Sequence, residues 1–197
     1  MHRVVTPAAV GSSPTAPAIT QTKNKIMNIF VLDKDPQRAA TMACDKHVVK
    51  MILETAQMMC TVIDSHDIHP PYRATHAKHP CTIWASESQA NWQWLTNYGL
   101  ALSTEYTERY GRVHKSQSVI EWCRDQNINL PSSGLTPFAQ AMPPQYKNEC
   151  VVTAYRDYYM GEKERIATWK YSSTPSWWFK STRSSQTKQK EQNVISR

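Results

Sequence analysis

The chain has 197 residues and a mass of 22.6 kDa, which is long enough for one domain with a sizeable core. Hydrophobic residues make up 40% of the sequence and aromatic residues 10%, a composition that excludes a wholly disordered chain. Apolar runs stay far below the roughly 18 residues of a membrane span, so no membrane association is predicted. The net charge of +7 favours a nucleic-acid partner.

The positive charge is concentrated at the two ends of the chain. Residues 1–26 contain three basic residues and no acidic one, and residues 180–197 contain five basic residues and one acidic one. Residues 27–179 hold 15 of each sign and are neutral overall. We therefore predict a disordered N-terminal extension over 1–26, an all-α domain over 27–179 and a flexible basic tail over 180–197, with Met27 as the natural start.

The first predicted helix begins at Asp35–Pro36, because an acidic cap followed by proline is typical of a helix N-terminus. From there apolar and small residues recur at spacings of three and four as far as Val62, which predicts one buried helix face. The preceding apolar segment Ile29–Leu32 fits either a strand or the first core contact.

Three more helices are predicted along the chain, over Pro80–Tyr110 with Gly111 as its stop, over Ser116–Gln126 and over Gln145–Ala167. Prolines break residues 65–80 and 127–144 into long loops, and an aromatic segment, residues 169–179, closes the domain. The predicted fold class is mainly α, a single compact domain of about four helices with long Pro-rich loops.

The first helix carries a group of polar side chains that suits an active site. His47, Lys50 and Glu54 follow the spacing i, i+3, i+7, so they line one edge of the helix beside its apolar face, next to Lys46. Such a border can hold an acid–base group, an anion holder and an orienting carboxylate. The alternative is an ordinary amphipathic border with a Lys50–Glu54 pair.

Other polar and aromatic residues also have two interpretations. Ser88 and Asn91, on the buried face of the second helix, either line a substrate pocket or tie helices together. A basic cluster at a helix end, Arg109, Arg112 and Lys115, either contacts phosphate groups or complements the helix dipole. Two tryptophans, Trp177 and Trp178, either stack on bases or form a lid over the core.

Residues 66–81 contain five possible zinc ligands, namely His66, His69, His76, His79 and Cys81. Their spacing matches no standard zinc finger, so hydrogen-bonding roles in a loop are favoured and no cofactor is predicted. The five cysteines of the chain form no CxxC pair, and their odd number argues against a disulfide framework. A reducing compartment, the cytoplasm, is therefore expected.

Four runs of sequence carry a resemblance to known proteins: MNIFVLDKDPQRAATMACDKHVVKMILETAQ at 27–57, ATHAKHPCTIW at 74–84, EYTERYG at 105–111 and TPSWWF at 174–179. They look like bacteriophage-encoded proteins and are remotely similar to the pyrimidine-dimer DNA glycosylases of the endonuclease V type. The resemblance implies a compact, all-α, cofactor-free repair enzyme.

The resemblance also implies roles for individual residues. In that family the amine of the first residue after the removed methionine attacks the sugar C1′ to form an imine, a helix carboxylate assists, and arginines hold the DNA backbone. By position, Asn28 matches the amine and Lys46 and Lys50 match the cations. His47 stands where the family has its carboxylate, and Glu54 is the nearest substitute.

The sequence thus predicts a DNA-acting repair enzyme whose specific form is a glycosylase and AP lyase. The alternative is a non-catalytic phage module that binds DNA or a host protein. A zinc-dependent hydrolase built on residues 66–81 is the third interpretation. DNA is the expected partner, and the lesion recognised and the oligomeric state stay open.

Overall fold

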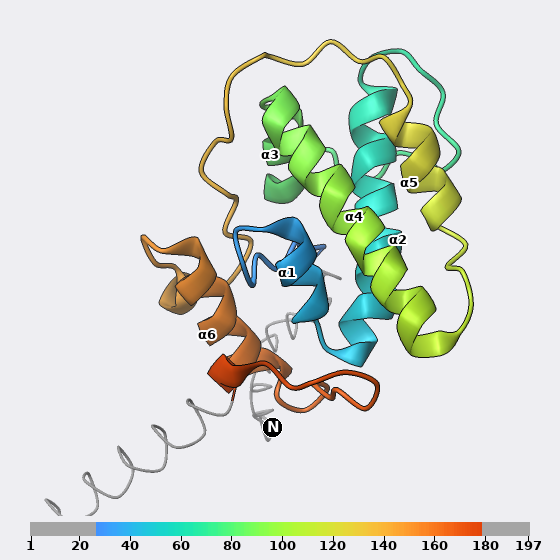
Figure 1. Cartoon of the computed structure of the whole chain (residues 1–197). Coiled ribbons are helices and arrows are strands. Elements are labelled where there is room, and N and C mark those ends of the chain that lie inside the picture. The colour runs from blue at the N-terminus through green and yellow to red at the C-terminus, as the bar shows by residue number, and fades with distance from the viewer. Residues whose placement is uncertain (1–26, 179–197) are drawn as a thin grey trace, which may run out of the picture.

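Figure 1 shows the computed structural model of the chain, which describes residues 27–178. Within that span the chain forms helices and no strand, which confirms the mainly α prediction. The elements are α1 (Pro36–Thr41), α2 (Asp45–Asp64), α3 (Pro80–Ser86), α4 (Gln89–Tyr110), α5 (Gln117–Arg124), the 3-10 helix η1 (Pro144–Tyr146) and α6 (Val151–Lys163). The predictions for residues 1–26 and 180–197 lie outside the described residues.

The helix predicted to start at Asp35–Pro36 is two helices, α1 and α2. Asp35 caps α1 as predicted, but α1 ends at Thr41 and residues 42–44 separate it from α2, with Cys44 extended at φ −67° and ψ 159°. The carbonyl oxygens at the end of α1 accept hydrogen bonds from the side chains of Arg109 and Trp169. Contacts from distant parts of the chain therefore satisfy the backbone where the helix is interrupted.

The helix predicted over Pro80–Tyr110 is also divided, into α3 and α4. Ser88 lies between them in extended backbone, and its hydroxyl accepts a hydrogen bond from the Asn91 backbone at 3.1 Å, so it is the N-cap of α4. The predicted stop is confirmed, because α4 ends at Gly111 with a left-handed φ of 66°. The last helix, α6, begins at Val151, later than predicted.

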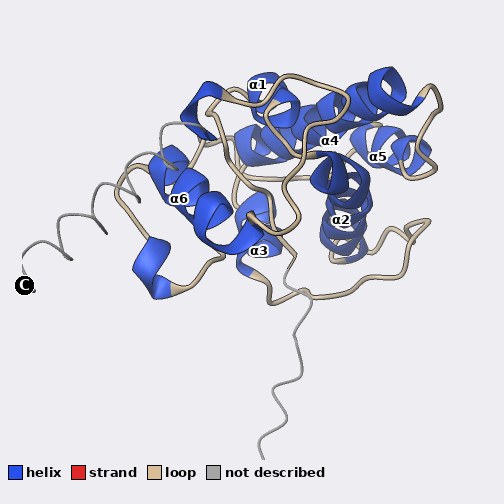
Figure 2. Cartoon of the chain, turned by 90° about the horizontal axis from the view of Figure 1, so that it is seen from below, coloured by secondary structure: helices blue, strands red, loops and turns tan. Residues whose placement is uncertain are grey.

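The long helix α2 lies at the centre of the molecule and packs against α3, α4 and α5 (Figures 1 and 2). Its predicted apolar face is confirmed, since Val48, Met51 and Met58 are all buried. At Gly99 of α4 a Cβ atom would lie 2.7 Å from the Thr55 methyl group, so a residue without a side chain permits this close packing.

The segment that precedes α1 is buried in the core. Ile29–Leu32 forms no strand, but each of its residues is buried, so the interpretation as the first core contact is correct. Its Phe30 packs against the Tyr155, Tyr158 and Tyr159 side chains of α6. The segment thus joins α6 to the central helices.

One end of the molecule gathers the first turn of α2 and the last turns of α4 and α6 (Figure 1). Residues 168–171 run across this end: the Asp45 backbone donates to the Thr168 carbonyl at 2.8 Å, and the Tyr110 and Tyr171 ring centroids lie 5.1 Å apart. Within residues 27–178 there is no helix with both the length and the apolar character needed to cross a membrane.

Candidate active site

Asn28 is held in a buried position by hydrogen bonds from both its backbone and its side chain. Its backbone N–H donates to Glu54 Oε2 at 3.2 Å, its side-chain amide donates to the Ala141 carbonyl at 2.8 Å, and its Oδ1 accepts from the Ile29 backbone at 2.8 Å. The residue is 1% exposed. The segment before α1 therefore meets α2 at the Glu54 carboxylate, 26 residues after Asn28 in the sequence.

Glu54 also forms an ion pair with Lys50, one turn earlier on α2. Lys50 Nζ lies 2.9 Å from Glu54 Oε1, and the side chains are 42% and 1% exposed, respectively. A carboxylate that is almost fully buried is stable only where charged and hydrogen-bonding partners compensate its lost hydration. Glu54 is thus placed between a backbone N–H inside the protein and an ammonium group that reaches solvent.

His47 is packed among aromatic side chains. Its ring stacks on Phe30 with centroids 4.4 Å apart and meets Tyr159 edge-on at 5.0 Å, and its buried Nδ1 has no hydrogen-bond partner within 27–178. Burial, helped by the charges of Lys163 and Lys50, lowers the pKa of His47 to about 3. A buried imidazole of this kind is poorly suited to accept a proton, so the geometry favours Glu54 over His47 as the acid–base group.

Phe30 adopts an unusual backbone conformation beside this group. Its φ of 34° lies in the left-handed region, which is costly for a side chain of this size. The ring stacks with His47 and with Tyr158, whose centroids lie 4.4 Å and 6.1 Å away, respectively. The surrounding aromatic contacts hold the segment in this shape directly after Asn28.

Lys163, at the end of α6, is a site residue that sequence reasoning missed. Its ammonium donates to the Tyr158 hydroxyl at 3.1 Å and lies 5.9 Å from the Phe30 ring centroid. Lys163 of α6 and Lys50 of α2 are the two positive charges that act on His47. No pattern in the sequence links α6 to α2, so only the folded chain reveals this pairing.

Arg109 is not available to contact a phosphate, contrary to the prediction. Its side chain is 2% exposed and forms ion pairs with Glu105 at 2.7 Å and Asp45 at 3.3 Å. The same guanidinium donates to the carbonyl oxygens of Ala43 at 2.8 Å and Thr41 at 3.1 Å. Arg109 ties α4 to the junction of α1 and α2 and is a structural residue.

The other predicted cationic residues are exposed. Lys46, Arg112 and Lys115 all lie on the surface, and the Arg112 guanidinium lies 5.8 Å from the Tyr106 ring centroid. Lys46 is in the first turn of α2, and Tyr110, just before Arg112, donates to the backbone carbonyl of Asp45 at 3.2 Å. The two groups of cations therefore belong to the same end of the molecule.

Trp177 and Trp178 are half-buried and packed into an aromatic cluster. The Trp177 indole N–H points at Met42 Sδ, at 3.4 Å, and the Arg156 guanidinium lies 5.4 Å from the Trp177 ring centroid. The Trp178 ring meets Trp169 at 5.0 Å. These contacts favour the interpretation as a lid over the junction of α1 and α2.

Ser88 and Asn91 tie elements together and do not face the α2 site. Besides the N-cap bond, Asn91 donates to the Trp84 carbonyl and to the Thr136 hydroxyl, both at 2.7 Å, and accepts from the Thr136 backbone at 3.0 Å. Both residues are fully buried. Their polar groups fix the long loop onto the start of α4, so the pocket interpretation is not supported.

The residues at 66–81 do not converge as metal ligands. His66 bonds the Val62 carbonyl at 3.0 Å, and His79 accepts from the Cys81 backbone at 3.2 Å as the cap of α3. Burial raises the pKa of the Cys81 thiol to about 12. No group of three or more His, Cys, Asp or Glu side chains suited to a metal occurs in residues 27–178, which removes the basis for the zinc hydrolase.

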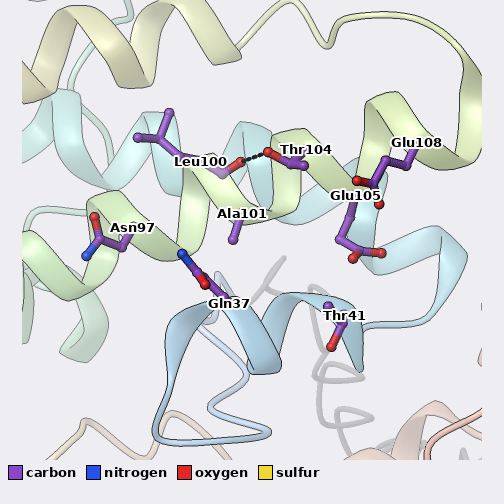
Figure 3. Close-up of a pocket in the computed structure, with 8 residues that line it drawn as sticks. All are labelled: Gln37, Thr41, Asn97, Leu100, Ala101, Thr104, Glu105 and Glu108. Atoms are coloured by element: carbon purple, nitrogen blue, oxygen red, sulfur yellow. Dashed lines mark hydrogen bonds between the residues drawn. The ribbon is translucent and has the colours of Figure 1, made fainter.

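A surface groove of about 500 Å³ lies between α1 and α4 (Figure 3). Its polar lining includes Gln37, Asn97, Glu105 and Glu108. None of the residues around Glu54 contributes to it, and its two carboxylates would repel a phosphate backbone. We therefore place the candidate active site at Asn28, Lys50 and Glu54.

Comparison with family models shows that residues 27–118 match the pyrimidine dimer DNA glycosylase family. The matching segment includes Asn28, His47, Lys50 and Glu54, and it ends before α6, which supplies Lys163. Comparisons with curated proteins and with solved structures return no match. The family match supports a function of the DNA-repair type.

Proposed function

We propose that the protein is a DNA glycosylase and AP lyase that acts on damaged duplex DNA. The observation that carries this proposal is the buried Glu54 carboxylate, 3.2 Å from the Asn28 nitrogen and 2.9 Å from the Lys50 ammonium. The similarity to the pyrimidine dimer DNA glycosylase family covers these residues and makes a pyrimidine dimer the first lesion to test.

In this proposal Glu54 serves as the acid–base group of the reaction. A carboxylate beside an amine can accept the proton that the amine must lose, and it can return a proton to the departing base. Its burial keeps bulk water away, which strengthens its electrostatic effect on charge that develops at the sugar. His47, neutral above a pH of about 3, supports Phe30 rather than transferring protons.

The exposed cations at the same end supply the contacts to the phosphate backbone. Lys46, Arg112 and Lys115 are accessible, and the positive end of the α2 dipole points the same way. The residues of 27–179 carry no net charge, so DNA binding in the domain depends on this local cluster. A protein that works on DNA also fits the reducing compartment that the cysteine pattern predicts.

The proposal is tested by incision of two duplexes, one with a single pyrimidine dimer and one with an abasic site. We expect wild-type protein to cleave at the lesion and Glu54→Gln protein to be at least about 100-fold slower, as for loss of a general acid–base group. Glu149→Gln, which removes an exposed carboxylate, is the matched control and should cleave normally. Binding of both duplexes without any incision would refute the enzyme and favour the non-catalytic binding module.

A further inference from the structure

The amine that the proposed reaction requires is not available at Asn28 in this chain. Asn28 follows Met27, and a methionine before a residue as large as asparagine is poorly removed. The Asn28 nitrogen therefore stays in a peptide bond, and amide nitrogens are not nucleophilic. Met27 and Asn28 are 2% and 1% exposed, and the Asn28 side chain is fixed by its bond to Ala141. A sugar could not reach this nitrogen without rearrangement of the segment.

A second amine lies at the same carboxylate. Lys50 Nζ is 2.9 Å from Glu54 Oε1, and the Lys50 side chain is 42% exposed, so its amine can be reached from solvent. Among the ion pairs formed within residues 27–178, Lys50 supplies the only lysine ammonium. Lys163, by comparison, points at the Tyr158 ring and hydroxyl.

We infer that Lys50 is the nucleophile that forms the imine with the deoxyribose C1′, with Glu54 as its proton acceptor. This inference rests on the proposed glycosylase and lyase function. Lysine amines form imines with aldehydes, and a neighbouring carboxylate provides the base that an ammonium needs to become nucleophilic. The Asn28 N–H then has a different role, which is to hold Glu54 in place.

At an abasic site the reaction begins on the open-chain aldehyde. Glu54 takes a proton from the Lys50 ammonium, the free amine adds to C1′, and loss of one water leaves a protonated imine. Removal of a proton from C2′ then breaks the C3′–O bond, and the 3′ phosphate leaves with the electron pair. Hydrolysis of the imine by water returns the lysine amine.

At an intact damaged nucleotide the same amine attacks C1′ and the glycosidic C1′–N bond breaks. The base leaves with the electron pair and takes up the proton that Glu54 holds. The attached amine then gives a second proton to Glu54, the C1′–O4′ bond of the sugar ring breaks, and O4′ takes that proton as the protonated imine forms. The two reactions therefore share one covalent intermediate on Lys50. That intermediate can be captured, because borohydride reduces a protonated imine to a stable secondary amine.

The test is borohydride trapping of the full 197-residue chain on an abasic duplex, with Lys50→Arg as the variant. Arginine keeps a positive charge beside Glu54, but a guanidinium stays protonated and forms no imine. We expect the trapped fraction to fall at least about 100-fold, with abasic-DNA binding within about threefold of wild type. Lys34→Arg, which alters an exposed lysine outside the site, should be trapped normally.

Peptide mapping of the trapped wild-type protein tests the same assignment without any variant. The deoxyribose remnant is expected on Lys50. An adduct on Asn28 or on any other amine, or undiminished trapping of Lys50→Arg, would overturn the assignment while leaving the proposed function intact. Absence of any trapped product from wild-type protein would refute the lyase function and this inference together.

Discussion

At the scale of single residues, burial gives Glu54 and His47 different chemical roles although both lie on the same edge of α2. Glu54 is buried with a backbone N–H and a lysine ammonium as its partners. His47 is buried among aromatic rings near two lysines, so its charged form is disfavoured. These surroundings support the proposed proton-transfer role of Glu54 and a packing role for His47.

The buried, neutral His47 makes the stability of the protein depend on pH. Its pKa is about 3 in the folded protein and near 6.5 when unfolded, so the unfolded chain binds the proton more readily as pH falls below 6.5. Stability is therefore lost on acidification from pH 6.5 toward pH 3. Between pH 6.5 and pH 5 we expect this histidine to account for about 2 kcal/mol of the loss.

The measurement is the free energy of unfolding in urea at pH 7 and at pH 5, for wild type and for His47→Phe. Phenylalanine retains the stack on Phe30 and does not titrate, so the variant should lose less stability on acidification. His79 and His114, whose pKa values are also lowered by burial, are common to both proteins. Equal pH dependence in the two proteins would contradict a neutral His47.

At the scale of elements, Arg109 connects three helices at the end of the molecule where α2 begins. Its guanidinium joins α4 to the last carbonyl groups of α1 and to Asp45 at the start of α2. Asp45 also accepts from the Lys170 backbone at 2.7 Å, which adds the segment after α6. Arg109 therefore fixes the first residue of α2, next to Lys46.

Replacement of Arg109 by methionine should destabilise the protein by about 3–5 kcal/mol, because Asp45 would remain buried without its cation. Arg112→Met, three residues away on the surface, is the control and should change stability little. Chemical denaturation measures both effects. A small loss for Arg109→Met would show that this guanidinium does not tie the helices together.

The contrast between Arg109 and Arg112 shows which features the sequence could predict. Local signals worked: Asp35–Pro36 starts α1 and Gly111 ends α4. The burial of Arg109 depends on residues more than 60 positions away, which no local pattern reports. The same holds for Glu54, because its partner Asn28 belongs to a segment without helical periodicity.

At the scale of the whole molecule, the charge distribution separates binding from catalysis. Residues 180–197 contain five basic residues and one acidic one, whereas residues 27–179 are neutral overall. Each phosphate contact releases counterions, so it makes the DNA affinity depend more steeply on salt concentration. The tail can therefore strengthen DNA binding without taking part in the chemistry at Glu54.

Deletion of residues 180–197 should weaken DNA binding and lower the slope of log Kd against log salt concentration by up to about 4. Incision by saturating enzyme should persist, because Lys50 and Glu54 are intact. Fluorescence anisotropy over a salt series measures the slope. An unchanged slope would show that the tail makes no phosphate contact, and loss of all incision would show that the tail is needed for the chemistry.

The central claim is that Glu54 drives imine chemistry on DNA, and single-turnover incision of an abasic duplex tests it most directly. With enzyme in excess, the rate reports the chemical steps rather than binding or product release. We predict rapid incision by wild-type protein and a rate at least about 100-fold lower for Glu54→Gln, with equal melting temperatures. Equal incision rates for the two proteins, or no incision by wild type, would contradict the claim.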